Sequence, residues 1–400
     1  MDTTVRERYD AAVMNQYSIY IHLPFCKTRC AYCDFFSTVR DPIPTEGYQR
    51  ALVREWNRRR GYFESIGPLR SLYIGGGTPS LWPAEGVCEL LSHFDLQPDT
   101  EVTVEVNPRD RDRAWFDAAV RAGVRRFSVG VQALDDGRLR FLGRTHTAKD
   151  GLAAVEAARS AGAQSVSGDL IYGTPGQTEE GVERELHELV ESGVSHLSAY
   201  ELTVAEETPL GRRRLQGERV KASERRLTAL YRTVREAAAA LDFAQYEISN
   251  WAREGHRSVH NMSYWQGGIY CGLGAGAHGF FTAVPEQLRT RYGNGNLVEA
   301  YIYDVLSSHA PTAAHFGEQG FTETVSDLDH ARERVMLGLR TVDGVAFEDI
   351  LQWVPEALID KWREEAERLQ TEGWARIHSG RLLPTAEGLL RADGLAERFF

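Results

Sequence analysis

Long apolar runs are missing from this sequence. Of its 400 residues, 42% are hydrophobic and 26% are charged, and the mean hydropathy is −0.39. No window reaches the roughly 18 uninterrupted apolar residues that a membrane-spanning helix needs. The opening stretch MDTTVRERYDAAVMNQ carries acids and bases and lacks the apolar core of a secretory signal. We therefore expect a cytoplasmic protein, for which peripheral association with a membrane stays open.

Positive charge is also in short supply. The sequence has 46 Lys and Arg against 57 Asp and Glu, which gives a net charge of −11 and a pI near 5.6. Such a chain offers no bulk attraction to the phosphate backbone of DNA or RNA. We therefore expect no nucleic-acid partner.

Cysteine is rare too, and the five that occur are a poor basis for a disulfide framework. Three of them form a C-x3-C-x2-C run, Cys26, Cys30 and Cys33, directly after a predicted strand. Three thiolates on one loop can hold an iron–sulfur cluster, and the lack of a fourth ligand nearby would leave one iron open. The alternatives are buried apolar thiols or a zinc site, which usually needs four protein ligands; His22 and Asp34 are badly spaced for that role.

Residues 16–250 alternate between apolar runs and amphipathic stretches. The helical stretches include one with Tyr48, Leu52, Trp56 and Phe63 on one face. The candidate strands are Tyr17–Leu23, Ser71–Ile74, Glu101–Val106, Arg126–Val131, Ser165–Ile171, His196–Leu202 and, more weakly, Phe243–Ile248. Six or seven strand-then-helix units predict an α/β fold with a parallel sheet, closed into a full or partial barrel.

The character of the sequence changes after Asn250. Residues 251–310 contain a Trp, Tyr and His-rich stretch and a Gly/Ala run, and we expect them to form a connecting segment. Residues 311–400 predict helices, a short hairpin around Ser379-Gly380 and a last helix, which is typical of a winged-helix-like domain. Because the chain is acidic, we interpret this part as a packing or partner domain.

Further motifs follow predicted strand ends, where barrels of this kind place their chemistry. The glycines of Gly75-Gly76-Gly77-Thr78-Pro79 let a backbone approach a ligand closely, or form a tight turn. Glu105 could bond a hydroxyl or ammonium group, or be a solvated acid. Arg144 could grip a carboxylate in two places or lie at the surface. Gln132 and Asp169 end two more of these motifs.

The cysteine loop and its aromatic neighbours resemble the signature of radical S-adenosylmethionine (radical SAM) proteins. The stretch IYIHLPFC before the loop is similar to the branch that contains oxygen-independent coproporphyrinogen III dehydrogenase and the haem chaperone HemW. The resemblance implies a partial (β/α)6-type radical SAM barrel over residues 16–250, a [4Fe-4S] cluster, S-adenosylmethionine on the open iron, and an electron donor for the cluster. It implies that SAM contacts Tyr20, Gly76, Gly77, Thr78, Glu105, Gln132, Arg144, Asp169 and also Thr203.

Two departures separate the sequence from the dehydrogenase pattern. The dehydrogenase motif continues C-x-C after its third cysteine, whereas Asp34 and Phe35 follow Cys33 here, and only 25 residues precede Cys26. In addition, residues 260–265 read HNMSYW, which resembles the H-N-x-x-Y-W motif of the HemW family.

The HemW resemblance implies haem as a ligand and haem-accepting proteins as partners. A neutral imidazole is a common axial ligand of haem iron, and aromatic side chains can flank a porphyrin. His260 is therefore our candidate haem ligand, although a histidine beside aromatics can also be a packed core residue. Because His260 is far along the chain from the SAM motifs, we expect its substitution to spare the cluster and SAM binding.

We therefore expect a haem-trafficking protein on a radical SAM scaffold. The alternative is an enzyme, the oxygen-independent coproporphyrinogen III dehydrogenase, which would remove hydrogen from propionate side chains before decarboxylation. A radical SAM methyltransferase or tRNA-modifying enzyme is a third possibility, which the acidic composition and the lack of further catalytic cysteines disfavour.

Overall fold

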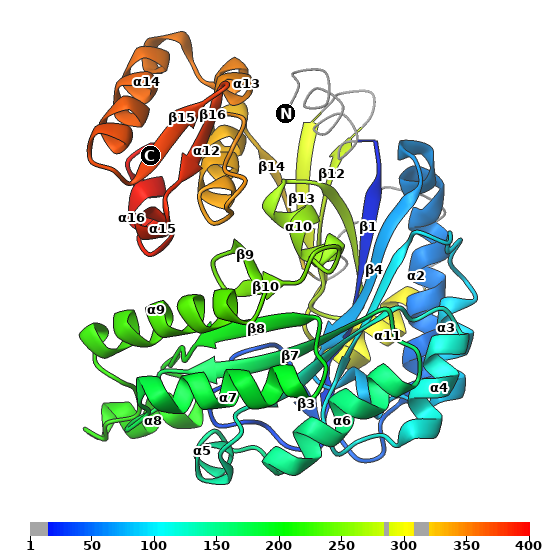
Figure 1. Cartoon of the computed structure of the whole chain (residues 1–400). Coiled ribbons are helices and arrows are strands. Elements are labelled where there is room, and N and C mark those ends of the chain that lie inside the picture. The colour runs from blue at the N-terminus through cyan, green and yellow to red at the C-terminus, as the bar shows by residue number, and fades with distance from the viewer. Residues whose placement is uncertain (1–14, 284–287, 308–319) are drawn as a thin grey trace.

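The computed structural model describes residues 15–283, 288–307 and 320–400 (Figure 1). Within them, one sheet of 12 strands has the order β14-β13-β12-β11-β1-β4-β5-β6-β7-β8-β10-β9. Residues 1–14, which make up most of the opening stretch that lacks the apolar core of a secretory signal, lie outside the described residues, as do residues 311–319 of the expected C-terminal domain.

Six neighbouring strands of this sheet run parallel and form the partial barrel that the sequence predicts. They are β1 (Tyr17–Leu23), β4 (Leu69–Gly76), β5 (Glu101–Val106), β6 (Arg126–Gln132), β7 (Ser165–Tyr172) and β8 (His196–Glu201). Figure 1 shows helices along the outer side of these strands. The helices of this half are α2 (Thr45–Ile66), α3 (Ala84–Leu91), α4 (Arg113–Arg121), α5 (Asp136–Phe141), α6 (Ala148–Ser160), α7 (Glu179–Glu191), α8 (Pro209–Leu215) and α9 (Glu224–Ala240).

The seventh candidate strand is not a further parallel strand, so that part of the prediction is wrong. The segment forms β9 (Ala244–Glu247), which turns back at once into β10 (Asn250–Ala252). β10 then pairs antiparallel with β8, with Asn250 opposite Ser198. No helix separates β9 from β10, and a parallel pairing needs such a crossover.

The sheet continues on the other side of β1, through residues that we expected to be a connecting segment. β11 (Ile269–Leu273) is parallel to β1, and the antiparallel strands β12 (His278–Ala283), β13 (Leu288–Gly293) and β14 (Phe321–Val325) follow. α10 (Val259–Trp265) precedes β11, and α11 (Val298–Ser307) follows β13. A Cβ atom at Gly272 would lie 1.9 Å from the carbonyl oxygen of His278, so close backbone packing explains this glycine of the Gly/Ala run.

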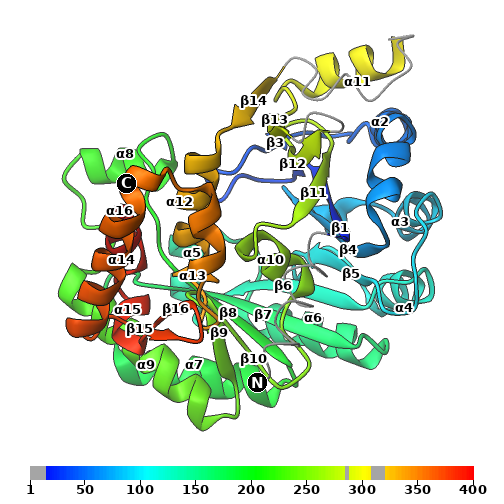
Figure 2. The same ribbon diagram turned by 90° about the horizontal axis from the view of Figure 1, so that it is seen from above.

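The C-terminal part has the predicted order of helices, hairpin and last helices. Its elements are α12 (Asp327–Gly338), α13 (Phe347–Ile350), α14 (Glu356–Thr371), β15 (Ala375–His378), β16 (Arg381–Pro384), α15 (Ala386–Leu389) and α16 (Ala392–Glu397). Ser379 and Gly380 both have positive φ, 48° and 72°, as a two-residue type I′ hairpin turn requires. Figure 2 shows this domain beside α10, in keeping with contacts between α10 and α12. The predicted fold class is confirmed.

The two faces of the parallel strands differ in chemistry. Ile19, Ile21 and Val104 are completely buried towards the helices. The alternate positions carry hydroxyl groups, such as those of Ser18, Ser71, Thr103, Ser128 and Ser167. Barrel interiors are usually filled by branched aliphatic residues, so this polar lining is unusual. Buried hydroxyls need hydrogen-bond partners, which are other side chains, water or a ligand.

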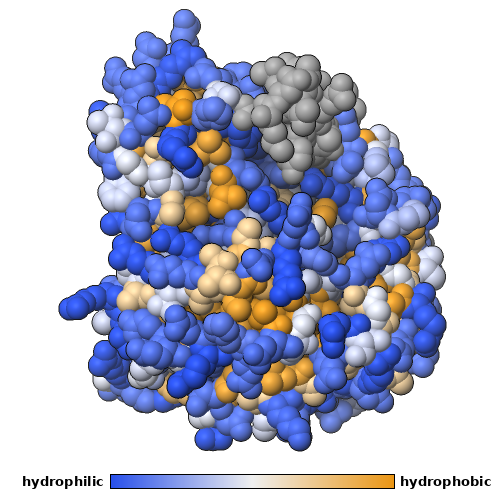
Figure 3. Space-filling model, in the orientation of Figure 1, coloured by the Kyte–Doolittle hydropathy of each residue, from blue (hydrophilic) through white to orange (hydrophobic). Residues whose placement is uncertain are grey.

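Figure 3 shows a face on which hydrophilic side chains surround smaller apolar areas. No helix in residues 15–283, 288–307 and 320–400 is long and apolar enough to cross a membrane.

Candidate functional site

The cysteine loop lies at the end of β1 and is held by short backbone contacts. β2 (Phe25–Cys26) pairs in parallel with β3 (Thr38–Val39), which fixes where the loop leaves and returns. Inside the loop, the amide of Ala31 donates to the carbonyl of Leu142, and the carbonyl of Ala31 accepts from the amide of Leu210. The loop between the thiols is therefore anchored to the segments around α5 and α8.

All three thiols of the loop are free, and two of them have polar neighbours. The Thr78 hydroxyl donates to Sγ of Cys26 at 3.5 Å, and Nη1 of Arg144 donates to Sγ of Cys30 at 3.3 Å. Burial raises the pKa of the Cys26 and Cys33 thiols, so an isolated thiolate is disfavoured there. Donors beside the sulfurs suit thiolates whose charge is shared with iron, so this set of three thiols fits an iron–sulfur cluster.

No three His, Cys, Asp or Glu side chains within the described ranges are grouped as ligands of one metal ion.

The glycine motif after β4 is tightly packed. Gly76 has a φ of +119°, and a Cβ atom at Gly77 would lie 2.6 Å from the carbonyl oxygen of Phe25. The amide of Gly77 donates to the carbonyl of Leu23 at 2.9 Å. Close packing against the start of the cysteine loop is therefore enough to explain why glycine occupies these positions. The close approach of a ligand to this backbone stays a prediction.

Glu105 holds this glycine motif from the neighbouring strand. Its Oε2 accepts from the amide of Gly76 at 3.1 Å, and its Oε1 accepts from the hydroxyl of Tyr73 at 2.9 Å. Burial raises the pKa of the Glu105 carboxyl to about 7, although both hydrogen bonds favour the ionised form. A cationic ligand group beside Glu105 would favour the carboxylate.

Gln132 and Asp169 lie on the next two strands. Gln132 has a φ of 65°, a left-handed conformation that is uncommon outside glycine and that marks candidate functional positions. Asp169 accepts from the hydroxyls of Ser128 and Ser167, each at 2.7 Å. Burial raises the pKa of the Asp169 carboxyl. Thr203, just past β8, is exposed.

Arg144 joins the cysteine loop to the strand ends. Besides its contact with Cys30, its guanidinium donates to Oδ1 of Asn107 and, at 3.2 Å, to the carbonyl of Gly130. The cysteine loop, the glycine motif and the side chains of Glu105, Gln132, Arg144 and Asp169 therefore belong to the carboxyl-terminal side of the sheet. The surface alternative for Arg144 does not apply, since its guanidinium is engaged with these groups.

Two histidines at this end were missed as parts of the site. His22 hydrogen-bonds through Nδ1 to the hydroxyl of Tyr20 and through Nε2 to the carbonyl of Phe36, each at 2.9 Å. His146 hydrogen-bonds through Nε2 to the carbonyl of Val131 at 2.9 Å. Their spacing from predicted site residues could have identified both histidines. His22 is two residues from Tyr20 on the same face of β1, and His146 is two residues from Arg144.

His260 lies at the other end of the strands. Glu101, the first residue of β5, accepts from the amides of Val259 and His260 and so fixes the start of α10. The imidazole is only 1% exposed, and it hydrogen-bonds to the hydroxyl of Ser71 at 2.9 Å and to that of Tyr264 at 3.0 Å. Both ring nitrogens are thus occupied inside the protein, and burial lowers the pKa of His260 to about 3.

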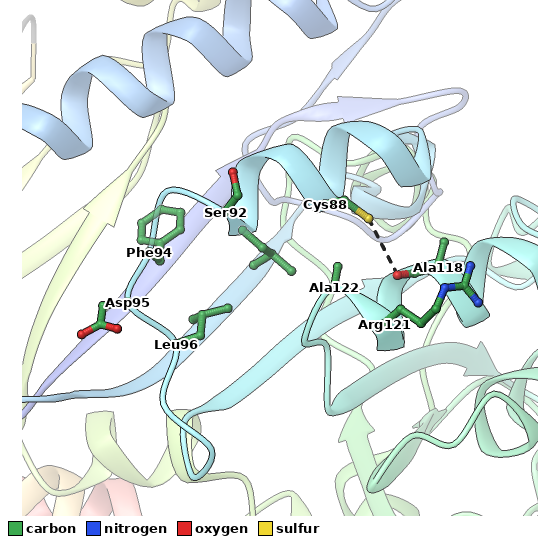
Figure 4. A pocket seen from close by; sticks show the side chains of 9 residues that line it. Cys88, Ser92, Phe94, Asp95, Leu96, Ala118, Arg121 and Ala122 are labelled. Atoms are coloured by element: carbon green, nitrogen blue, oxygen red, sulfur yellow. Dashed lines mark hydrogen bonds between the residues drawn. The ribbon is translucent and has the colours of Figure 1, made fainter.

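The remaining cysteines lie away from these groups. Cys88 is half-buried, lines a shallow hollow between α3 and α4, and donates to the carbonyl of Ala118 at 3.7 Å (Figure 4). Cys271 is completely buried in β11.

Comparison with known proteins shows which families the sequence matches. The Radical SAM superfamily model matches residues 20–189, and the HemN C-terminal domain model matches residues 325–391. "Heme chaperone HemW" of Mycobacterium tuberculosis is 34% identical over 387 residues, which are 95% of this chain and 93% of the relative. "Radical S-adenosyl methionine domain-containing protein 1, mitochondrial" of Mus musculus is 33% identical over 94% of this chain and 86% of the relative.

The fold has a solved counterpart. The coproporphyrinogen III oxidase (HemN) of Escherichia coli superposes with a TM-score of 0.78 over 98% of this chain and 92% of that one, at 20% identity. That likeness shows the shared fold, whereas the sequence relatives show the family. The chain belongs to the HemW family of the radical SAM superfamily.

Proposed function

We propose that this protein is a haem chaperone, which binds haem and transfers it to haem-accepting proteins. The observation that carries the proposal is the match to relatives named heme chaperone HemW along nearly the whole of both chains. We further propose three functional parts: a barrel with the cluster and SAM in residues 16–250, a segment with the haem motif in 251–310 that extends the same sheet, and a partner-facing domain in 311–400.

The barrel is proposed to hold a [4Fe-4S] cluster through Cys26, Cys30 and Cys33, with SAM on the open iron. When bound and reduced, such a cluster supplies an electron that cleaves the SAM sulfonium. The chain's own side chains would bind and orient SAM: the Glu105 and Asp169 carboxyls offer acceptors, and Arg144 holds the loop at Cys30. Tyr20, Gln132 and the glycine motif complete the proposed site.

His260 is the proposed haem ligand, and its buried position means that one ring nitrogen must become free before haem iron can bind. Because both ring nitrogens are hydrogen-bonded in the buried state, iron can bind only after the imidazole has left Ser71 or Tyr264. Haem loading therefore requires a movement of the His260 side chain or of the side chain that is bonded to it.

A dehydrogenase function is the alternative on this fold. Phe35 stands where the dehydrogenase motif has a further cysteine, and its side chain is 65% exposed beside the cluster loop. This departure favours the chaperone.

Parallel assays on one anaerobically reconstituted preparation test the proposal. We expect added haem to give a Soret band that moves to an apo-haemoprotein, and we expect no protoporphyrinogen from coproporphyrinogen with SAM and a reductant. Robust turnover without haem transfer would replace the chaperone with the dehydrogenase.

The proposed SAM site predicts a pH dependence that centres on Glu105. Its pKa of about 7 in the free site means that SAM, which is cationic, must displace a proton at lower pH. We expect SAM affinity of the cluster-loaded protein to fall by up to about tenfold from pH 8 to pH 6, because binding is then linked to proton release. Calorimetric titration across this range provides the measurement.

Glu105→Gln should remove this pH dependence and weaken SAM binding at pH 8 by about one to two decades, because a hydrogen bond to a charged group is lost. Glu89→Gln, which changes an exposed carboxylate on α3, should behave like the unmodified protein. A flat pH profile in the unmodified protein would argue against Glu105 as a SAM contact.

A further inference from the structure

Tyr73 lies between the proposed SAM site and the proposed haem ligand. Its ring stacks on the imidazole of His260, with centroids 4.9 Å apart and an angle of 26° between the planes. The ring of Tyr20 lies 6.1 Å away on the adjacent strand. The register of β1 and β4 places Tyr20 directly opposite Tyr73, so this arrangement follows from the strand pairing.

The hydroxyl end of Tyr73 reaches the SAM side. It donates to Oε1 of Glu105 at 2.9 Å, and Oε2 of the same carboxyl accepts from the amide of Gly76 at 3.1 Å. One side chain thus contacts His260 with its ring and Glu105 with its hydroxyl. Two sites at opposite ends of the strands are therefore joined by two direct contacts.

The far side of α10 is covered by β9, β10 and the C-terminal domain. Met262 packs in a small apolar cluster with Tyr246 and Ala252, against which Trp265 and Val342 also pack. Arg257 forms an ion pair with Asp343 at 2.8 Å. The α10 helix is therefore held between the barrel and the C-terminal domain, and withdrawal of His260 would remove its ring from that of Tyr73.

We propose that Tyr73 is a positioning residue that couples SAM binding to the release of His260, so that bound SAM holds His260 in its buried state. The proposal rests on the proposed haem chaperone function. A cationic group of SAM beside Glu105 favours the ionised carboxylate. The ionised form accepts a stronger hydrogen bond from the Tyr73 hydroxyl than the protonated form does. A firmly held Tyr73 ring favours the stacked, buried position of His260. Haem binding requires the state in which His260 has left that position.

Coupling of this kind is reciprocal, which makes it measurable from both sides. We expect SAM to weaken haem binding to the cluster-loaded protein by about fivefold or more, and haem to weaken SAM binding by the same factor. Haem is titrated by its Soret band with and without saturating SAM, and SAM is titrated calorimetrically with and without haem.

Tyr73→Phe keeps the ring on His260 and removes the hydroxyl that reaches Glu105. In this variant haem should still bind, and its affinity should no longer respond to SAM. Tyr303→Phe is the matched control, because Tyr303 is 71% exposed on α11, and it should retain the coupling.

Haem binding that is unaffected by SAM in the unmodified protein would overturn the proposal without any variant, and so would undiminished coupling in Tyr73→Phe. Either result leaves the chaperone function standing. Failure of the unmodified protein to bind haem at all would instead overturn both.

Discussion

Substitution of Cys26, Cys30 or Cys33 by serine is expected to leave the protein without a four-iron cluster. Each thiolate would be one of only three protein ligands, and an alcohol is a poor replacement for a thiolate on iron. Iron and sulfide content, together with the visible absorption of anaerobically reconstituted protein, provide the measurement. SAM binding should be lost in the same variants, because its proposed anchor is the open iron.

Cys88→Ser is the matched control for this experiment. Cys88 is free and half-buried in the outer helical layer, away from the loop, so its replacement should keep the full cluster. Far-UV circular dichroism separates loss of the cluster from loss of the fold, because Cys30 and Cys33 are only partly buried. A complete four-iron cluster in any of the three loop variants would refute the assignment.

The parallel half of the fold could be predicted because its strands are short apolar runs between amphipathic helices. The bounds predicted for Tyr17–Leu23 and Glu101–Val106 agree with β1 and β5. The same pattern wrongly predicted a seventh parallel strand at residues 243–248, because a run of apolar residues does not show whether a helix or a tight turn follows it. Its antiparallel pairing is determined by the hairpin with β10.

The candidate site was predictable only where its members stand together in sequence. The cysteine loop and the glycine motif are compact patterns, whereas Tyr73 shows no signal until the register of β1 and β4 is known. Distance along the chain also does not show which side chains His260 contacts across the sheet. We expected its substitution to spare the SAM site, yet the imidazole stacks on Tyr73, which contacts Glu105.

His260→Ala is expected to have two separate effects. Removal of a fully buried side chain leaves a cavity and strands the hydroxyls of Ser71 and Tyr264, so the free energy of unfolding should fall by about 2–4 kcal/mol. Loss of the proposed iron ligand should change the Soret band and weaken haem retention by at least about tenfold, since even changes next to a metal ligand cost that much. Cluster content should be unchanged.

Substitution of a second buried histidine distinguishes loss of the haem ligand from loss of protein stability. His196 is 1% exposed, and its ring nitrogens hydrogen-bond to the hydroxyl of Ser167 at 2.8 Å and to that of Tyr246 at 2.7 Å, an environment that closely matches that of His260. His196→Ala should therefore destabilise the protein by a similar amount, as measured by denaturant unfolding, and yet retain the Soret band of the unmodified protein. Equal loss of haem in both variants would mean that the loss reports instability, and a different residue would then be the haem ligand.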